Sequence, residues 1–196
     1  MRTLTYFVAC SVDGFIADPD GDASSMMKYV DGEFLEYLTD RYPDTIAEEG
    51  RKALGVDGVP NRRFDTVIQG TGSYRLGLDA GFPSPYGHLR EIVASRTLTE
   101  SPHPRVELVH GDRLVERVRE LKAEDGPLGI WLCGGSKVAG SLFDEVDELV
   151  VKTYPEVYGA GLPMFGAGSS PAAFALEECR VFGNGVIVRT YSRVRP

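Results

Sequence analysis

The stretch Gly129–Leu142, GIWLCGGSKVAGSL, contains the change of pattern that decides the fold. Its first part, Gly129–Cys133, is a short apolar run, which favours a buried strand. Two glycines, Gly134 and Gly135, end this run, and Ser136–Phe143 then predicts a helix. A strand that leads through a glycine turn directly into a helix is typical of an α/β protein.

The residues alone leave two interpretations of this glycine turn open. Glycine lets a phosphate approach the backbone closely, and the free N–H groups of a first helical turn can donate hydrogen bonds to it. Alternatively, the glycines serve only to pack the strand tightly against the helix. The three-glycine fingerprint of dinucleotide-binding folds is absent, so the turn by itself does not decide between these functions.

The segments on both sides of this stretch continue the alternation of strands and helices. The further predicted strands are Thr3–Cys10, Phe15–Ala17, Thr66–Ile68, Leu89–Ser95, Arg105–His110 and Glu148–Tyr154. The further predicted helices are Asp31–Arg41 (with Asp31 as N-cap), Ile46–Leu54, Gly72–Leu78 and Asp112–Ala123. Two last strands, Phe174–Val181 and Val186–Val194, flank Asn184-Gly185, which predicts a β-hairpin. We therefore predict a single α/β domain over residues 1–196, with a mixed, mostly parallel twisted sheet, flanking helices and a C-terminal β-hairpin.

Composition limits the classes of function. The net charge of −8 argues against general binding of nucleic acid or of an anionic membrane. The three cysteines are odd in number and widely spaced, so they predict no disulfide framework. The N-terminus lacks a signal-peptide profile, and no apolar run is long enough to span a bilayer. We expect a cytoplasmic protein.

Two other predicted strands also end in small or hydrogen-bonding residues. Gly70–Ser73 follows one of them, and Ser95-Arg96 lies at the end of the next. Ligands of α/β sheets bind beyond the carboxyl ends of the strands, and a guanidinium suits a phosphate monoester because it donates in a planar fork. The alternative for Arg96 is a solvated surface charge. Three such strand ends favour a phosphate-bearing ligand more than one does.

Seven short blocks, in a fixed order along nearly the whole chain, are more specific than any single motif. They are Ser11–Ala17 (SVDGFIA), Cys133–Ser136 (CGGS), Gly140–Leu142 (GSL), Val146–Leu149 (VDEL), Tyr154-Pro155, Gly159–Gly161 (GAG) and Leu162–Phe165 (LPMF). With these blocks the chain resembles the dihydrofolate-reductase-like superfamily, specifically the branch that includes the reductase domain of riboflavin biosynthesis.

The resemblance implies a homodimeric, NADPH-dependent reductase that delivers hydride to a small conjugated heterocycle, pterin- or pyrimidine-like. It implies that Ala9 and Ile16 line the nicotinamide pocket, and that Ser95 and Arg96 face the adenosine ribose and its 2′-phosphate. The residues implied for the other phosphates are Gly70, Thr71 and Ser73 on one side and Gly134, Gly135, Ser136, Lys137 and Val138 on the other.

Two departures from the relatives keep alternatives open. The relatives usually have Gly-Arg-x-Thr-Tyr where this chain has Gly70–Tyr74 (GTGSY), so Thr71 replaces a cationic phosphate contact. Riboflavin-pathway reductases commonly carry an acid just before the glycine pair, where this chain has Cys133. Two alternative functions therefore stay open. These are the 5-amino-6-(5-phosphoribosylamino)uracil reductase of the riboflavin pathway and a non-catalytic nucleotide-binding or sensor protein.

The catalytic residues are not assigned by the sequence. In dihydrofolate reductases an acid on the first helix positions the pterin, and Glu33, Glu36 and Asp40 lie on the corresponding predicted helix. Asp13 is a further candidate, although an Asp before Gly14 more commonly bonds its own turn. No metal site is expected, because the three histidines lack metal-ligand spacing.

Overall fold

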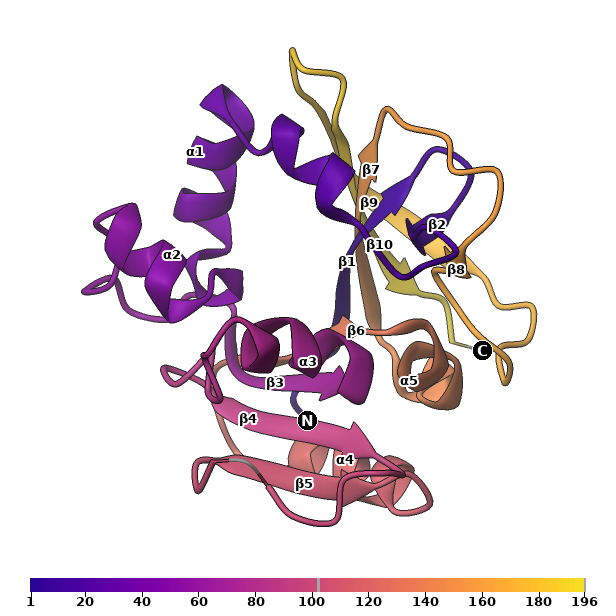
Figure 1. Ribbon diagram of the computed structural model, residues 1–196. Helices are drawn as coiled ribbons and strands as arrows, with labels where there is room; N and C mark the ends of the chain where they lie inside the picture. Colours follow the sequence, from indigo (N-terminus) through magenta and orange to yellow (C-terminus); the bar gives the residue numbers. More distant parts are fainter. Residues whose placement is uncertain (102, 196) are drawn as a thin grey trace.

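A computed structural model describes residues 1–101 and 103–195. Within these residues eight strands form one sheet in the order β5-β4-β3-β6-β1-β7-β10-β9 (Figure 1). Their bounds are Leu4–Ser11 (β1), Phe64–Gly70 (β3), Arg90–Ser95 (β4), Val106–His110 (β5), Gly129–Gly134 (β6), Glu148–Tyr154 (β7), Phe174–Val181 (β9) and Ile187–Arg193 (β10). Strand β10 is antiparallel to β7 and β9, and the other neighbouring pairs are parallel. The predicted mixed, mostly parallel sheet with a C-terminal hairpin is confirmed.

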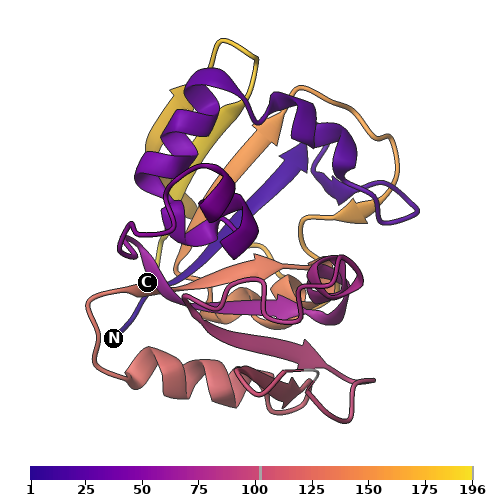
Figure 2. The same ribbon diagram turned by 60° about the vertical axis from the view of Figure 1, so that its left-hand side comes forward.

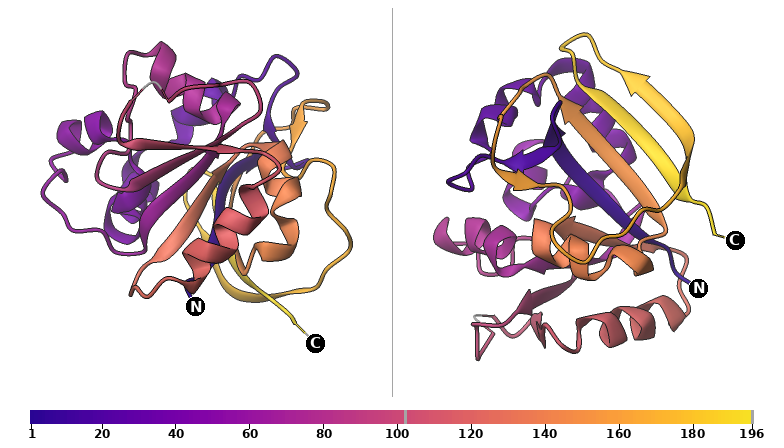
Figure 3. Two further views of the ribbon diagram at one scale, coloured as in Figure 1. Left: turned by 90° about the horizontal axis from the view of Figure 1, so that it is seen from below. Right: turned by 90° about the vertical axis from the view of Figure 1, so that its right-hand side faces the viewer.

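Helices cover both faces of this sheet (Figures 2 and 3). The helices are α1 (Gly32–Arg41), α2 (Glu48–Ala53), α3 (Thr71–Asp79), α4 (Leu114–Ala123) and α5 (Ser136–Ser141), with 3₁₀ turns at Ser24–Tyr29 (η1), Pro43–Thr45 (η2) and Phe143–Glu145 (η3). Apolar side chains of α4 and α5 pack into one core cluster, and those of α1 pack into a second cluster on the opposite face. A separate two-stranded sheet pairs β2 (Phe15–Ala17) with β8 (Leu162–Pro163). No helix in the described ranges is long and apolar enough to cross a lipid bilayer.

The two clusters explain why the central strands lack hydrophobic alternation. In β1, Tyr6, Val8 and Cys10 belong to the cluster of α4 and α5, whereas Phe7 belongs to the cluster of α1. A strand that is buried on both faces is apolar throughout. The apolar run at the start of the chain is therefore the expected sequence of a central parallel strand.

Some local expectations were wrong in detail. Asp31 precedes α1 as predicted, but its side chain makes no capping bond and instead accepts a hydrogen bond from Asn184 Nδ2 at 3.1 Å. The helix predicted over Ser136–Phe143 ends at Ser141 and is followed by η3. A side chain from a distant hairpin thus competes for Asp31, which local sequence cannot indicate.

Candidate active site

Gly70 lets the carboxyl end of β3 pack closely against the glycine turn that follows β6. A Cβ atom added at Gly70, the last residue of β3, would lie 2.9 Å from Val138 Cγ2 and 3.5 Å from the backbone nitrogen of Gly135. Real Cβ atoms do not approach a carbon so closely, so a larger residue would push the end of β3 away from α5. Gly70 therefore lets two of the predicted phosphate-binding segments lie in contact.

Open space lies beside the glycine turn. Gly134 has a φ of +136°, which favours glycine, and the Gly134–Gly135 peptide bond is cis. A Cβ added at either glycine would meet one atom within 4 Å, Ser73 Oγ at 3.7 Å. The structure thus brings Gly70, Ser73, Gly134, Gly135 and Val138 together around a gap that a ligand could enter.

Two helices begin at this gap. Helix α3 starts at Thr71 and α5 starts at Ser136, and the N–H groups of a first helical turn have no partner four residues earlier. Ser136 is buried, whereas the side chain of Lys137 is exposed to solvent. Backbone donors, rather than a cluster of cations, are what this edge of the sheet offers to a phosphate.

The strand end at Ser95 is held by its own hydrogen bonds. Ser95 Oγ accepts a hydrogen bond from Thr71 Oγ1 at 2.9 Å. It also accepts the N–H groups of Thr97 at 3.1 Å and Leu98 at 2.9 Å. Ser95 therefore fixes the turn after β4 and links it to α3, and its hydroxyl lies beneath the turn rather than facing solvent.

Arg96, in contrast, extends into solvent. Its aliphatic part lies near Gly111, where an added Cβ would be 3.2 Å from Arg96 Cγ. Among residues 1–101 and 103–195 its guanidinium forms no ion pair, unlike those of Arg90 and Arg113. Arg96 is thus available to an anionic ligand at the edge of the sheet.

The two residues predicted to line the nicotinamide pocket lie on different sides. Ala9 is partly buried and packs against the cluster of α1, whereas Ile16 of β2 packs against the cluster of α4 and α5. Both lie at the carboxyl end of β1, because β2 follows β1 after one short turn.

The face of the sheet that carries Ala9 is open near the carboxyl ends of the central strands. Ala9, Cys133 and Lys152 on β1, β6 and β7 are only partly buried, and we call these three residues the open patch. On the opposite face the neighbouring Cys10 and Leu132 are 4% and 0% exposed. Central strands are normally covered on both faces, so this exposure marks a surface available to a ligand.

Lys152 is the residue of this patch that sequence reasoning missed. Its Nζ lies 4.0 Å from the centroid of the Phe7 ring, and burial lowers the pKa of the ammonium to about 8. The signal was present in the sequence of β7, ELVVKTY, where a lysine interrupts an apolar central strand. Burial also raises the pKa of Cys133 to about 12, so its thiol is not activated.

Asp13 makes structural hydrogen bonds. Its carboxylate accepts Ser11 Oγ at 2.6 Å and the N–H groups of Tyr158 at 3.2 Å and Gly159 at 2.7 Å. The hydrogen bond from Ser11 is the largest cause that lowers the pKa of Asp13. The carboxylate thus bonds within its own turn, as the sequence suggested, and also ties the loop after β1 to the segment after β7.

The three acids considered on the first helix lie on its exposed side. Glu33 forms an ion pair with Arg180 of β9 at 3.0 Å, and Asp40 forms one with Arg62 at 2.6 Å. Glu36 is likewise exposed, whereas the side of α1 that faces the sheet carries Phe34, Tyr37 and Leu38. The structure does not bring Glu33, Glu36 or Asp40 to the open patch.

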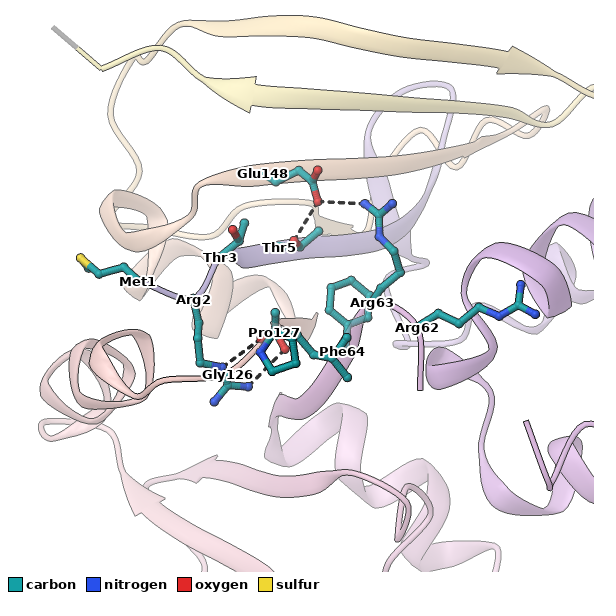
Figure 4. A pocket seen from close by; sticks show the side chains of 12 residues that line it. Met1, Arg2, Thr3, Thr5, Arg62, Arg63, Phe64, Gly126, Pro127 and Glu148 are labelled. Atoms are coloured by element: carbon teal, nitrogen blue, oxygen red, sulfur yellow. Dashed lines mark hydrogen bonds and ion pairs between the residues drawn. The ribbon is translucent and has the colours of Figure 1, made fainter. Parts of the chain in front are cut away.

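A pocket of about 310 Å³ lies at the opposite, amino ends of the strands (Figure 4). Arg63 in its wall pairs with Glu148 at 3.7 Å, and Arg2 pairs with Asp65 and Glu124. These cations already have partners, so the pocket lacks the free donors of the glycine turn. In the described part of the chain, no three His, Cys, Asp or Glu side chains gather as a metal site would require.

A family model, RibD C-terminal domain, matches residues 2–188. The chain belongs to this family. One relative, the uncharacterised protein YyaP of Bacillus subtilis (strain 168), is 27% identical over 195 residues, which are 97% of this chain and 94% of the relative.

Two solved structures are similar to this chain along nearly its whole length. A proposed riboflavin biosynthesis protein of Shewanella sp. PV-4 has a TM-score of 0.71 and 25% identity, with both chains covered completely. Dihydrofolate reductase of Enterococcus faecalis, solved with NADP(H), has a TM-score of 0.58 and 14% identity over 98% of this chain and 97% of that one. The family match confirms the predicted branch, and the similarity to dihydrofolate reductase confirms the predicted dihydrofolate-reductase-like fold.

Proposed function

We propose that this chain is an NADPH-dependent reductase that transfers hydride to a small conjugated heterocycle. The observation that carries the proposal is the space beside Gly134 and Gly135, where a Cβ added at either glycine would meet only Ser73 Oγ within 4 Å, at 3.7 Å. Helices α3 and α5 both begin there. Its backbone donors suit the phosphates of a dinucleotide. Family membership and the NADP(H) complex of the Enterococcus faecalis reductase support the same cofactor.

The residues present fit such a cofactor along the edge of the sheet. The proposed phosphate contacts are Gly70, Thr71, Ser73, Gly134, Gly135, Ser136, Lys137 and Val138, and Arg96 is proposed for the 2′-phosphate. Ser95 has a positioning role, because its Oγ holds Thr71. Ala9 and Ile16 are proposed to border the nicotinamide. When bound, the cofactor supplies the hydride, while these residues orient it and exclude water.

Nucleotide binding is the direct test. Purified protein is mixed with NADPH or NADH, and the melting temperature and the nicotinamide fluorescence are recorded. NADPH at 100 times its Kd should stabilise the folded state by about 2.7 kcal/mol, since it binds only that state. Lack of stabilisation by either nucleotide would contradict the proposal.

The riboflavin-pathway reductase is a second candidate, supported by the description of the Shewanella protein. Oxidation of NADPH is followed with dihydrofolate and with 5-amino-6-(5-phosphoribosylamino)uracil. Faster turnover of the uracil would favour this candidate. NADPH binding without oxidation, across a panel of heterocycles, would instead favour a sensor, the alternative that Thr71 in place of a cationic phosphate contact supports. We also propose a cytoplasmic homodimer, which light scattering and cell fractionation would test.

A further inference from the structure

Lys152 lies where the sheet is open. Its backbone pairs with Ala9 of β1 on one side and with Val188 of β10 on the other. The side chain points to the face covered by α1, because Nζ lies 4.0 Å from the ring of Phe7, a member of the core cluster of α1. Since Lys152 is only partly buried, a ligand on this face can reach its ammonium.

The ammonium has no anionic partner among the residues that the structure describes. Over residues 1–101 and 103–195 no hydrogen bond or ion pair to Nζ is formed, whereas Lys122, also on a buried face, pairs with Asp147 at 2.7 Å. Burial is the largest cause that shifts the pKa of Lys152, the Cys133 and Cys10 thiols contribute less, and no carboxylate contributes. A partly buried charge without a partner is costly unless a ligand supplies one.

The neighbouring strands β6 and β1 contribute thiols rather than carboxylates near Lys152. Burial raises the pKa of both thiols, Cys133 on β6 and Cys10 on β1. The segments that cover this face contribute phenols to the same core cluster, namely Tyr29, Tyr37, Tyr42, Tyr86, Tyr154 and Tyr158. Lys28, Arg63 and Arg180 also lie over rings of this cluster, but each of them pairs with a carboxylate. Lys152 differs from them because it has no anionic partner among residues 1–101 and 103–195.

We propose that Lys152 binds an oxygen atom of the hydride acceptor, which is therefore an oxo-substituted planar ring with a carbonyl or enolate oxygen. An ammonium donates hydrogen bonds and accepts none, so it selects oxygen acceptors. An amino-substituted ring that is protonated on binding would instead place two cations together. The acids that could hold such a cation, Glu33 and Glu36, lie on the exposed side of α1. This inference rests on the proposed function, since it names the acceptor of the same site.

Calorimetry with two matched pyrimidines tests the proposal. The probes are barbiturate, an anionic oxo-pyrimidine, and 2,4-diaminopyrimidine, a basic amino-pyrimidine, each titrated into the free and the NADPH-loaded protein. Wild type is expected to bind barbiturate more tightly. Lys152→Met, which keeps the chain length and removes the charge, should weaken barbiturate binding by about tenfold or more. Lys152→Arg should retain most of the affinity because it retains the charge.

A control and a pH series separate binding from folding. Lys52→Met removes an exposed ammonium whose partner is Glu49 at 2.9 Å, and should leave barbiturate affinity unchanged. Since burial lowers the pKa of Lys152 to about 8, wild-type affinity should fall as the pH rises from 7 to 9, while that of Lys152→Met stays constant. The melting temperature of Lys152→Met should not fall, because the variant removes an unpaired charge.

Three results would overturn the proposal: no binding of barbiturate by wild type, equal binding by wild type and Lys152→Met, or tighter binding of the diaminopyrimidine. A parallel fluorescence titration with NADPH distinguishes this failure from failure of the proposed function. If wild type does not bind NADPH, the proposed reductase function is contradicted. NADPH binding together with barbiturate binding that is independent of Lys152 contradicts the role of Lys152 alone.

Discussion

Gly70 and Gly72 are two residues apart but have different surroundings, and substitution by alanine should separate their roles. A Cβ at Gly70 would lie 2.9 Å from Val138 Cγ2, whereas a Cβ at Gly72 in α3 would meet no atom within 4 Å. Gly70→Ala should therefore lower the free energy of unfolding by about 1–3 kcal/mol. Gly72→Ala should be neutral or up to about 1 kcal/mol more stable, because alanine favours helix.

Urea unfolding of both variants measures these changes, and equal effects would show that close packing does not require glycine at position 70. The two variants also test whether a glycine at this strand end serves packing or phosphate binding, which the sequence alone left open. A glycine that is needed only for packing affects stability, whereas one that borders the ligand gap also affects nucleotide affinity. NADPH titration of Gly70→Ala at a temperature where it remains folded distinguishes these outcomes.

Arg96 should determine the preference for NADPH over NADH. The guanidinium is exposed and forms no ion pair among the residues that the structure describes, so a 2′-phosphate would be its partner. Arg96→Ala should weaken NADPH binding about tenfold, the value of one charge-assisted hydrogen bond, and should leave NADH binding nearly unchanged. Arg113→Ala is the matched control, because Arg113 is exposed and already pairs with Glu116 at 3.1 Å. Equal losses for both nucleotides would contradict this role.

Among the elements, β3 depends on a carboxylate far from it in sequence. Asp44 is fully buried and accepts the N–H groups of Arg62, Arg63 and Phe64 at 2.8, 2.7 and 2.9 Å. Asp44→Asn should lower the free energy of unfolding by about 2–4 kcal/mol, since an amide cannot accept all three donors equally and loses the charge.

Urea unfolding with Asp57→Asn as the exposed control measures this effect. Similar stability of the two variants would show that the start of β3 is not held by Asp44. The expected loss is large because the N–H groups of three consecutive residues, the last of them buried, would lose a charged acceptor.

These contacts also explain which elements the sequence could predict. Strands β1, β6 and β7 are apolar over most of their length because both of their faces are buried except near the carboxyl ends, so their positions follow from the run of apolar residues. Residues 43–63 lack this signal. Asp44 and Arg51 organise them through bonds to backbone groups of Pro43, Val59 and residues 62–64, which local patterns do not contain.

The candidate site likewise has one part that the sequence could predict and one part that it could not. Its glycine turn could be predicted, because the pair Gly134-Gly135 and the order of motifs around it are local features of the sequence. The open patch could not, because Ala9, Cys133 and Lys152 come from three strands whose side-by-side order is set by the fold. The acids on α1 were misleading for a related reason, since the side of the helix that faces the sheet is decided by Phe34, Tyr37 and Leu38.

At the scale of the whole molecule, one face of the sheet is closed by α4 and α5 and the other is open at the strand ends, where Lys152 is held with its pKa lowered to about 8. In the unfolded chain Lys152 is solvated and has the ordinary lysine pKa of about 10.4. Between these two values the unfolded state binds more protons than the folded state, so stability contributed by this residue increases as the pH rises.

The free energy of unfolding of wild type minus that of Lys152→Met should therefore increase from pH 8 to pH 10, by at most about 1.4 kcal/mol per pH unit. Taking the difference removes the titration of groups common to both proteins. Lys52→Met gives the opposite control: its ion pair with Glu49 raises the pKa of Lys52, so that difference should stay flat until the pH exceeds the ordinary lysine value. Urea unfolding at four pH values measures both differences. Parallel curves for wild type and Lys152→Met would mean that solvent reaches the ammonium freely, and Lys152 would then lack the partly dry surroundings that make it selective for an oxygen ligand.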